Sequence, residues 1–267
     1  MQNLEKLLDI MRALRDPETG CPWDIKQDFS SITTYTIEEA YEIADTIERG
    51  DMHELKGELG DLLFHIVFYA QMANEQGQFC FDDIVEVIND KLVRRHPHVF
   101  ADTEAGSDEE LLKAWEQQKA SEREGKGNYG EAGSALDGIA STLPALKWAE
   151  KIQKRAAHTG FDWDELAPVF AKLHEEIDEL KQEVEVENNH ERIIDEMGDV
   201  LFSCVNLSRH LGVSAEQALR QGNKKFIGRF QQMEKLIASE GRAIEDYSLE
   251  ELEQQWQKAK IELKQTE

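Results

Sequence analysis

One acidic pattern occurs twice in this chain of 267 residues, and it restricts the possible folds more than any other feature. The pattern is Glu-Glu-x-x-Glu, a spacer, and Glu-x-x-Asp followed by an apolar run. In the first copy the Glu-Glu-x-x-Glu part begins at Glu38 and the Glu-x-x-Asp part begins at Glu58, with a spacer of fifteen residues. In the second copy the two parts begin at Glu175 and Glu196, with a spacer of sixteen residues. Acidic residues three positions apart share one helix face. Each copy therefore predicts two helices that each carry a carboxylate stripe.

Further matches indicate that a whole domain is duplicated. Three patterns recur in the same order, Gly-x-x-Trp-Asp, Asn-x-Lys-x-x-x-Arg and Glu-Glu-Leu-x-x-x-Trp-x-x-x-Lys, beginning at Gly20 and Gly160, Asn89 and Asn223, and Glu109 and Glu250. The offset between matched residues stays between 134 (Asn89 to Asn223) and 141 (Glu109 to Glu250). Solenoid repeats are much shorter, about 20–50 residues. We therefore expect a domain over residues 1–120, a flexible linker rich in glycine and charge over 121–140, and a second domain over 141–267.

Helical spacing of apolar residues accounts for most of the chain outside that linker. A long apolar helix is expected from Asp51 to about Asn74, and Thr36-x-x-Glu39 is a capping-box pattern that places the start of the helix before it. Similar caps are expected at Ser107, Ser214 and Ser248. Alternating apolar and polar runs typical of strands are scarce. The sequence thus predicts an all-α protein.

Composition excludes several classes of partner. The formal net charge is −25, and binding of bulk nucleic acid or an anionic membrane requires clustered Lys and Arg. No apolar run approaches the length that crosses a bilayer. Three cysteines, Cys21, Cys80 and Cys204, lack metal-type spacing, which predicts reduced thiols in a cytoplasmic protein. A small phosphorylated ligand remains compatible with this charge.

The acidic stripes predict a metal site rather than ordinary solvated helix faces. The second acidic pair of each copy stands beside an apolar run, Leu62 to Ala70 or Val200 to Leu207, so it cannot all face water. Gly60 and Gly198 lie between the two acids at a cost of about 1 kcal/mol against alanine, and they suit the close approach of a facing helix. Oxygen ligation favours Mg²⁺, or Mn²⁺, over zinc. The expected ligands are Glu39, Glu42, Glu58 and Asp61, and Glu176, Glu179, Glu196 and Asp199.

Basic and aromatic residues recur near these stripes. Lys91 and Arg95, and likewise Lys225 and Arg229, lie four apart on one helix face and could neutralise phosphate oxygens. Trp115 and Trp256 each precede a lysine by four residues. These tryptophans are either buried anchors or platforms for a nucleotide base, and the sequence leaves both open.

With these residues assembled, the chain resembles the MazG-type nucleoside triphosphate pyrophosphohydrolases of the all-α NTP pyrophosphatase superfamily. The resemblance covers almost the whole length and includes Gly20-Cys21-Pro22-Trp23-Asp24 and the segment from Arg94 to Phe100. It implies hydrolysis of NTPs, with broad base tolerance, to NMP and pyrophosphate, with Mg²⁺, in a homodimer. It also implies nucleotide contacts from Lys172, Leu173, His174, Glu175, Glu176, Arg192, Ile193, Ile194, Asp195, Asp199, Lys225, Phe226, Ile227, Gly228, Arg229 and Trp256. Gly228 departs from the first copy, which has Arg94 at the matching position.

A mechanism follows as a hypothesis. Mg²⁺ held by Glu176, Glu179, Glu196 and Asp199 would polarise the triphosphate and acidify a bound water that attacks the α-phosphorus. Glu175 or Glu176 would position that water as a base. We expect the second domain to be the main hydrolase, because His96-Pro97 ends the basic helix of the first. The alternative is a helical module that senses nucleotides or binds a partner without turnover.

Overall fold

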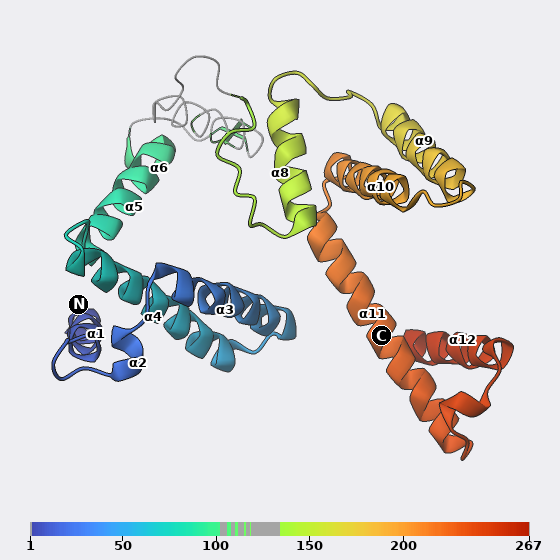
Figure 1. Cartoon of the computed structure of the whole chain (residues 1–267), viewed down its shortest axis with the longest axis horizontal. Coiled ribbons are helices and arrows are strands. Elements are labelled where there is room, and N and C mark those ends of the chain that lie inside the picture. The colour runs from blue at the N-terminus through green and yellow to red at the C-terminus, as the bar shows by residue number, and fades with distance from the viewer. Residues whose placement is uncertain are drawn as a thin grey trace. The chain divides into compact units, whose positions relative to one another are not determined.

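The computed structural model describes residues 2–101, then Gly106, Ser107, Glu110, Leu111, Trp115 and Gln118, and then residues 134–266. The described residues form helices, turns and connecting loops, which confirms the all-α prediction. They divide into two compact units, Met1–Gly127 and Asn128–Glu267 (Figure 1). Residues 121–133 of the expected linker, and its boundary at residue 120, lie outside the described residues. The predicted domain limits therefore stay predictions.

The first unit is organised around a helical hairpin. Its helices are α1 (Gln2–Leu14), α2 (Pro22–Ile25), α3 (Phe29–Arg49), α4 (Met52–Glu75), α5 (Phe81–Arg95) and α6 (Pro97–Phe100). Helices α3 and α4 pack together, and α1 and α5 contact α4. Gly50 makes the reversal between α3 and α4 at φ 71°, and the Asp51 side chain then accepts hydrogen bonds from the His53 and Glu54 amides. This tight turn brings the two acidic stripes of the first copy side by side.

The predicted start of α3 at Thr36 is wrong. The helix begins at Phe29, because the Asp28 side chain accepts from the Ser31 amide while the Ser31 hydroxyl accepts from the Asp28 amide. This reciprocal cap satisfies amides that would otherwise lack partners at the first turn. Thr36 lies inside the helix, where its hydroxyl donates to the Ile32 carbonyl.

The core of the first unit lies beneath the hairpin. Five apolar side chains are almost fully buried there, Met11, Ile32, Val67, Phe68 and Met72. Full burial of such a side chain stabilises a fold by about 1.5–3 kcal/mol. The core thus fixes α1, α3 and α4 relative to one another, and it leaves the acidic end of the hairpin outside the apolar packing.

The second unit repeats the hairpin and extends it. Its helices are α8 (Ala145–Ala157), α9 (Leu166–Val184), α10 (His190–His210), α11 (Ala215–Ser239) and α12 (Leu249–Thr266), with a 3₁₀ turn η1 (Ile244–Asp246). Helices α9 and α10 pack together as α3 and α4 do, and α8 contacts α10. Helices α11 and α12 form a second hairpin around Met233, Ile237, Tyr247 and Ala259.

The expected serine caps are present. Ser214 accepts from the Gln217 amide, and Ser248 accepts from the Glu251 amide while the Glu251 carboxylate accepts from the Ser248 amide. The same exchange joins Ser107 and Glu110. These caps are local, so a pattern of four residues predicted them, although the same pattern at Thr36 lies inside a helix.

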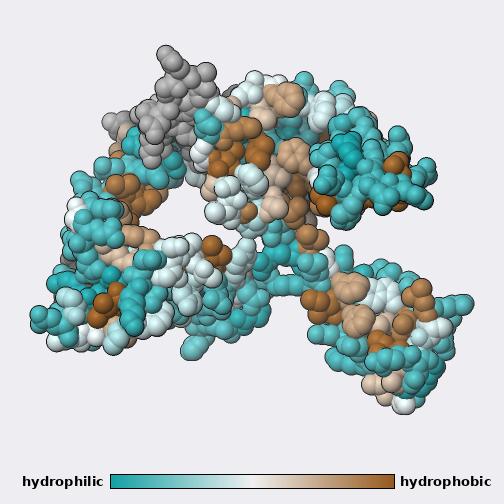
Figure 2. Space-filling view, in the orientation of Figure 1, coloured by the Kyte–Doolittle hydropathy of each residue, from teal (hydrophilic) through white to brown (hydrophobic). Residues whose placement is uncertain are grey.

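Among the described residues, no other helix makes the expected close approach to the mid-helix glycines. A Cβ atom built on Gly60 or Gly198 would meet nothing within 4 Å. Figure 2 shows apolar side chains at the surface of both units, and the exposed apolar residues include Leu59 and Leu63 beside Gly60 and Met197 and Leu201 beside Gly198. Both glycines therefore lie on open, partly apolar helix faces. Among the helices of the described residues, none is long and apolar enough to span a membrane.

Candidate metal centres

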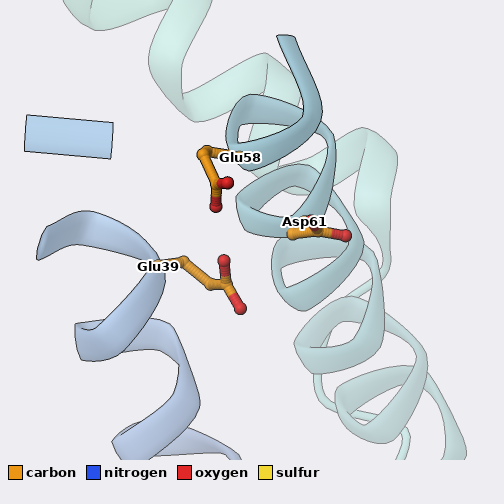
Figure 3. Close-up of side chains that lie close together, drawn as sticks. All are labelled: Glu39, Glu58 and Asp61. Atoms are coloured by element: carbon orange, nitrogen blue, oxygen red, sulfur yellow. The ribbon is translucent and has the colours of Figure 1, made fainter. Parts of the chain in front are cut away.

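The first carboxylate cluster lies between α3 and α4. Glu39 comes from α3, Glu58 and Asp61 come from α4, and one carboxylate oxygen of each lies within 4.8 Å of the others. Glu39 and Glu58 point toward one another across the gap between the two helices (Figure 3). Glu58 and Asp61 share a helix face because they are three residues apart. Three of the four oxygen ligands expected in this copy are thus brought together.

Burial and the neighbouring negative charges raise the pKa values of Glu39 and Glu58 in this cluster. Burial raises the pKa of Glu39, and the neighbouring charges of Glu42 and Asp61 raise it further. Burial, and then the charge of Glu42, raise the pKa of Glu58 in the same way. Glu42, the fourth expected ligand, therefore acts on the cluster although it is not among the three closest groups. In the described residues, no side-chain cation pairs with Glu39, Glu58 or Asp61.

The second cluster has the same geometry between α9 and α10. Glu176 from α9 and Glu196 and Asp199 from α10 have carboxylate oxygens within 4.8 Å of one another. Glu176 and Glu196 are buried, whereas Asp199 is exposed. The remaining expected ligand, Glu179, lies near them. Burial and the charges of Glu176 and Glu196 raise its pKa, while the charge of Lys172 lowers it.

Two cations distinguish the second cluster from the first. The Lys172 ammonium lies 2.9 Å from Glu176 and 2.7 Å from Glu175, and these hydrogen bonds raise the pKa of Lys172. The Arg192 guanidinium lies 2.6 Å from Glu196 and 2.8 Å from Asp195. Both buried carboxylates of this cluster are therefore paired in the metal-free protein.

The first copy has no counterpart of these cations. Tyr35 precedes Glu38 by three residues, as Lys172 precedes Glu175, and Glu54 precedes Glu58 by four, as Arg192 precedes Glu196. Each cation precedes a cluster carboxylate by four residues, a spacing that favours ion pairs on a helix. The sequence therefore carries this signal in the spacing of each cation from its carboxylate. Only the resemblance brought Lys172 and Arg192 into the candidate site.

The two basic residues expected to act from α11 form no ion pair with this cluster in the described residues. In the part of the chain that the structure describes, Lys225 and Arg229 form no ion pair with Glu176, Glu196 or Asp199. Trp256 of α12 is half-buried in the α11–α12 core, and its ring lies 5.2 Å from that of Phe226. This packing favours the anchor interpretation of Trp256. The remaining expected contacts, Leu173, His174, Ile193, Ile194, Ile227 and Gly228, stand on α9, α10 and α11.

Both donor sets suit a hard divalent cation. Carboxylate oxygens from two rigid helices can take positions around Mg²⁺ or Mn²⁺, which commonly bind through a few carboxylates and complete their shell with water and phosphate. No cysteine belongs to either cluster, and the described residues include no histidine in them. The chemistry of the donors therefore agrees with the expected ion.

Comparison with known proteins gives consistent matches. The model of the MazG nucleotide pyrophosphohydrolase domain matches residues 27–100 and 166–233. The chain is 51% identical to the nucleoside triphosphate pyrophosphohydrolase of Escherichia coli K12 over 261 residues, which are 97% of this chain and 98% of the relative. It is 43% identical to the nucleoside triphosphate pyrophosphohydrolase/pyrophosphatase MazG of Thermotoga maritima over 256 residues, 96% and 95% of the two chains. The two matched segments contain both carboxylate clusters.

Proposed function

The chain belongs to the MazG nucleotide pyrophosphohydrolase family, and from this premise we propose that its second carboxylate cluster is the main catalytic centre. The protein is a nucleoside triphosphate pyrophosphohydrolase, so it releases pyrophosphate from a nucleoside triphosphate and leaves the monophosphate. The observation that carries the proposal is the pair of cations, Lys172 and Arg192, on Glu176 and Glu196. Of the two clusters in the described residues, the second has cations paired with its buried carboxylates, and these cations supply positive charge for a triphosphate.

Glu176, Glu179, Glu196 and Asp199 would hold Mg²⁺ or Mn²⁺ in this centre. Such a cation supplies Lewis acidity to phosphate oxygens and lowers the pKa of a coordinated water. Glu175 lies at the edge of the cluster, held 2.7 Å from Lys172, and so could position the attacking water as a base, as could Glu176. Because the carboxylates are fixed on two packed helices, they need little reorganisation when substrate binds.

Lys172 and Arg192 would bind the triphosphate chain. A guanidinium offers a fork that matches phosphate oxygens, and an ammonium offers a compact point charge. We keep Lys225 and Arg229 in the proposal as residues that would contact phosphate oxygens of the bound nucleotide. Broad base tolerance is also part of the proposal. We further propose a homodimeric, cytoplasmic enzyme.

Paired substitutions test which centre performs hydrolysis. Glu176→Ala with Glu179→Ala should lower kcat with ATP and Mg²⁺ by at least about a hundredfold, because metal and substrate lose their ligands together. Glu39→Ala with Glu42→Ala should retain most of the activity. Phosphate release is measured with and without added inorganic pyrophosphatase, and phosphate should appear only when that enzyme is present.

The helical circular dichroism of both double variants serves as the folding control. If the first-cluster variant is inactive while the second-cluster variant retains turnover, the assignment of the main centre to the second unit is wrong. Equal losses in both variants would also contradict it, since they would indicate that the two centres contribute alike.

A further inference from the structure

Side-chain cations contact both buried carboxylates of the second centre. Lys172 and Arg192 each contact a buried carboxylate of the cluster, at 2.9 Å and 2.6 Å. The carboxylate side chains are only 7% exposed, whereas the Lys172 and Arg192 side chains are 36% and 54% exposed. The acids thus lie inside the fold, while the cations reach in from its surface.

A divalent ion and these cations compete for the same two carboxylates. Both Lys172 and Arg192 contact the Oε1 atom of a proposed metal ligand. A metal ion that approached alone would bring a positive charge next to two others. A triphosphate offers the guanidinium and the ammonium several charged oxygens. These oxygens are better partners for the two cations than a carboxylate that a metal ion also binds.

We propose that Lys172 and Arg192 exchange partners during substrate binding, leaving Glu176 and Glu196 for the triphosphate and so opening those carboxylates to metal. This inference rests on the proposed function and deepens it. It assigns the two residues a role in the empty enzyme as well as in the substrate complex. Metal affinity at the second centre should consequently depend on nucleotide, and by linkage nucleotide affinity should depend on metal to the same degree.

The first cluster supplies the matched comparison within the same chain. Tyr35 and Glu54 stand where the second copy has Lys172 and Arg192, and Glu54 is itself directed to Arg49 at 2.5 Å. No side-chain cation in the described residues has to leave Glu39 or Glu58 before a metal ion binds. The first cluster should therefore take up a divalent ion without help from nucleotide.

Mn²⁺ binding, followed by electron paramagnetic resonance of the free ion, tests the exchange without relying on turnover. The full-length protein carries Glu39→Gln and Glu58→Gln so that only the second centre reports. An ATP analogue with a methylene bridge between the α- and β-phosphorus atoms, at saturating concentration, provides the triphosphate. We expect the analogue to tighten Mn²⁺ binding about tenfold, within the usual range of coupling between two ligands.

Adding Lys172→Met and Arg192→Met to this background should tighten Mn²⁺ binding in the absence of the analogue several-fold, because the competing charges are gone. Lys181→Met is the control, since Lys181 is on the same helix and pairs with Asp178 at 2.8 Å, outside the cluster. It should leave Mn²⁺ affinity unchanged. The converse protein, with Glu176→Gln and Glu196→Gln, should bind Mn²⁺ at the first cluster equally well with and without the analogue.

Two outcomes would overturn the exchange. One is an unchanged Mn²⁺ affinity, without analogue, after loss of Lys172 and Arg192, and the other is an analogue effect of equal size at both clusters. Failure of the proposed function gives a different result, because Glu176→Gln with Glu196→Gln would then retain hydrolysis. Loss of hydrolysis in that variant, together with unchanged metal affinity in the Lys172 and Arg192 variant, rejects the exchange alone.

Discussion

Glu58 and Glu196 occupy equivalent positions in the two copies, but their electrostatic surroundings are opposite. Glu58 faces other carboxylates, and burial together with the charge of Glu42 raises its pKa. Glu196 is paired with Arg192 at 2.6 Å. Removal of a ligand from a repulsive cluster is expected to stabilise the metal-free protein. The structure restricts this expectation to the first cluster, because the second already has its counter-charges.

At the residue scale, we predict that Glu58→Gln raises the melting temperature of the protein in the presence of a chelator at pH 7. The neutral amide keeps the size of the side chain while it removes one charge from a repulsive set. Glu196→Gln is the matched control and should lower the melting temperature or leave it unchanged, because Arg192 loses a partner. Differential scanning calorimetry provides the measurement. A higher melting temperature for Glu196→Gln than for Glu58→Gln would contradict this account.

Single side chains also connect whole helices. Arg15, at the end of α1, donates to both carboxylate oxygens of Glu75 on α4 and to the Asp24 carbonyl of α2, and its guanidinium lies 5.3 Å from the centre of the Phe68 ring. Its side chain is only 9% exposed. The Arg15 hydrogen bonds also lower the pKa of Glu75. One residue therefore joins three helices of the first unit.

At the element scale, Arg15→Ala should lower the free energy of unfolding by about 1.5–3 kcal/mol, typical of hydrogen bonds to charged groups, because Arg15 is buried while Glu75 is partly exposed. Arg12→Ala is the control, because its pair with Asp9 is exposed and such pairs contribute about 0–1 kcal/mol. Urea unfolding followed by circular dichroism measures both. Similar losses for the two variants would show that the contacts of Arg15 do not stabilise the unit.

The second unit uses a different connection between its elements. Asp162, in the loop before α9, accepts two hydrogen bonds from Arg209 at the end of α10, at 2.8 and 2.5 Å. These bonds, with the charge of Arg209 and the Trp163 amide, lower the pKa of Asp162 below the ordinary value of 3.8. The ion pair thus fixes the loop against the far end of the acidic hairpin.

The depressed pKa sets the direction of a pH effect. A carboxylate whose pKa is lower in the folded state stabilises the fold above its unfolded pKa, and it loses that contribution as the pH falls through the folded value. Asp162→Asn should therefore cost about 1.5–3 kcal/mol at pH 7, typical of hydrogen bonds to charged groups. The difference from the unsubstituted protein should shrink as the pH falls below 3.8. Asp164→Asn, two residues along in the same loop, is the control, and this exposed substitution should change the free energy of unfolding by less than about 0.5 kcal/mol.

The whole molecule exposes apolar helix faces beside both clusters. On α10, Met197 and Leu201 lie four residues apart and are 44% and 51% exposed, and Gly198 between them has open space above it. On α4, Leu59 and Leu63 have the same relation to Gly60. No helix in the part of the chain that the structure describes covers these glycines, and in the proposed homodimer a second copy of the chain would cover them. This arrangement supports the proposed homodimer.

At the scale of the whole molecule, light scattering should give a mass of twice 30.6 kDa at micromolar concentration. Leu201→Asp should shift the protein toward the monomer, because a charge would be buried in an apolar contact. Val186→Asp is the control, since Val186 is similarly exposed but lies in the turn after α9. A monomeric unsubstituted protein would reject the dimer.

The sequence by itself determined the helical class, the duplication and six clustered carboxylates. These features are local or periodic: a spacing of three residues fixes a shared helix face, and two copies of one pattern require two similar hairpins. The same locality explains the serine caps. It also explains why the segment from Thr36 to Glu39 was misleading, because its capping pattern recurs inside a helix that Asp28 and Ser31 had already begun.

Only the tertiary structure decided which carboxylates are buried and where the glycine faces lie. The sequence places Lys172 and Arg192 four residues before Glu176 and Glu196, but the burial of these two carboxylates depends on how α9 packs on α10. Likewise, the open space over Gly60 and Gly198 depends on every helix that could have covered them. Contacts between distant segments follow from the summed packing of the whole unit, so no short pattern in the sequence encodes them.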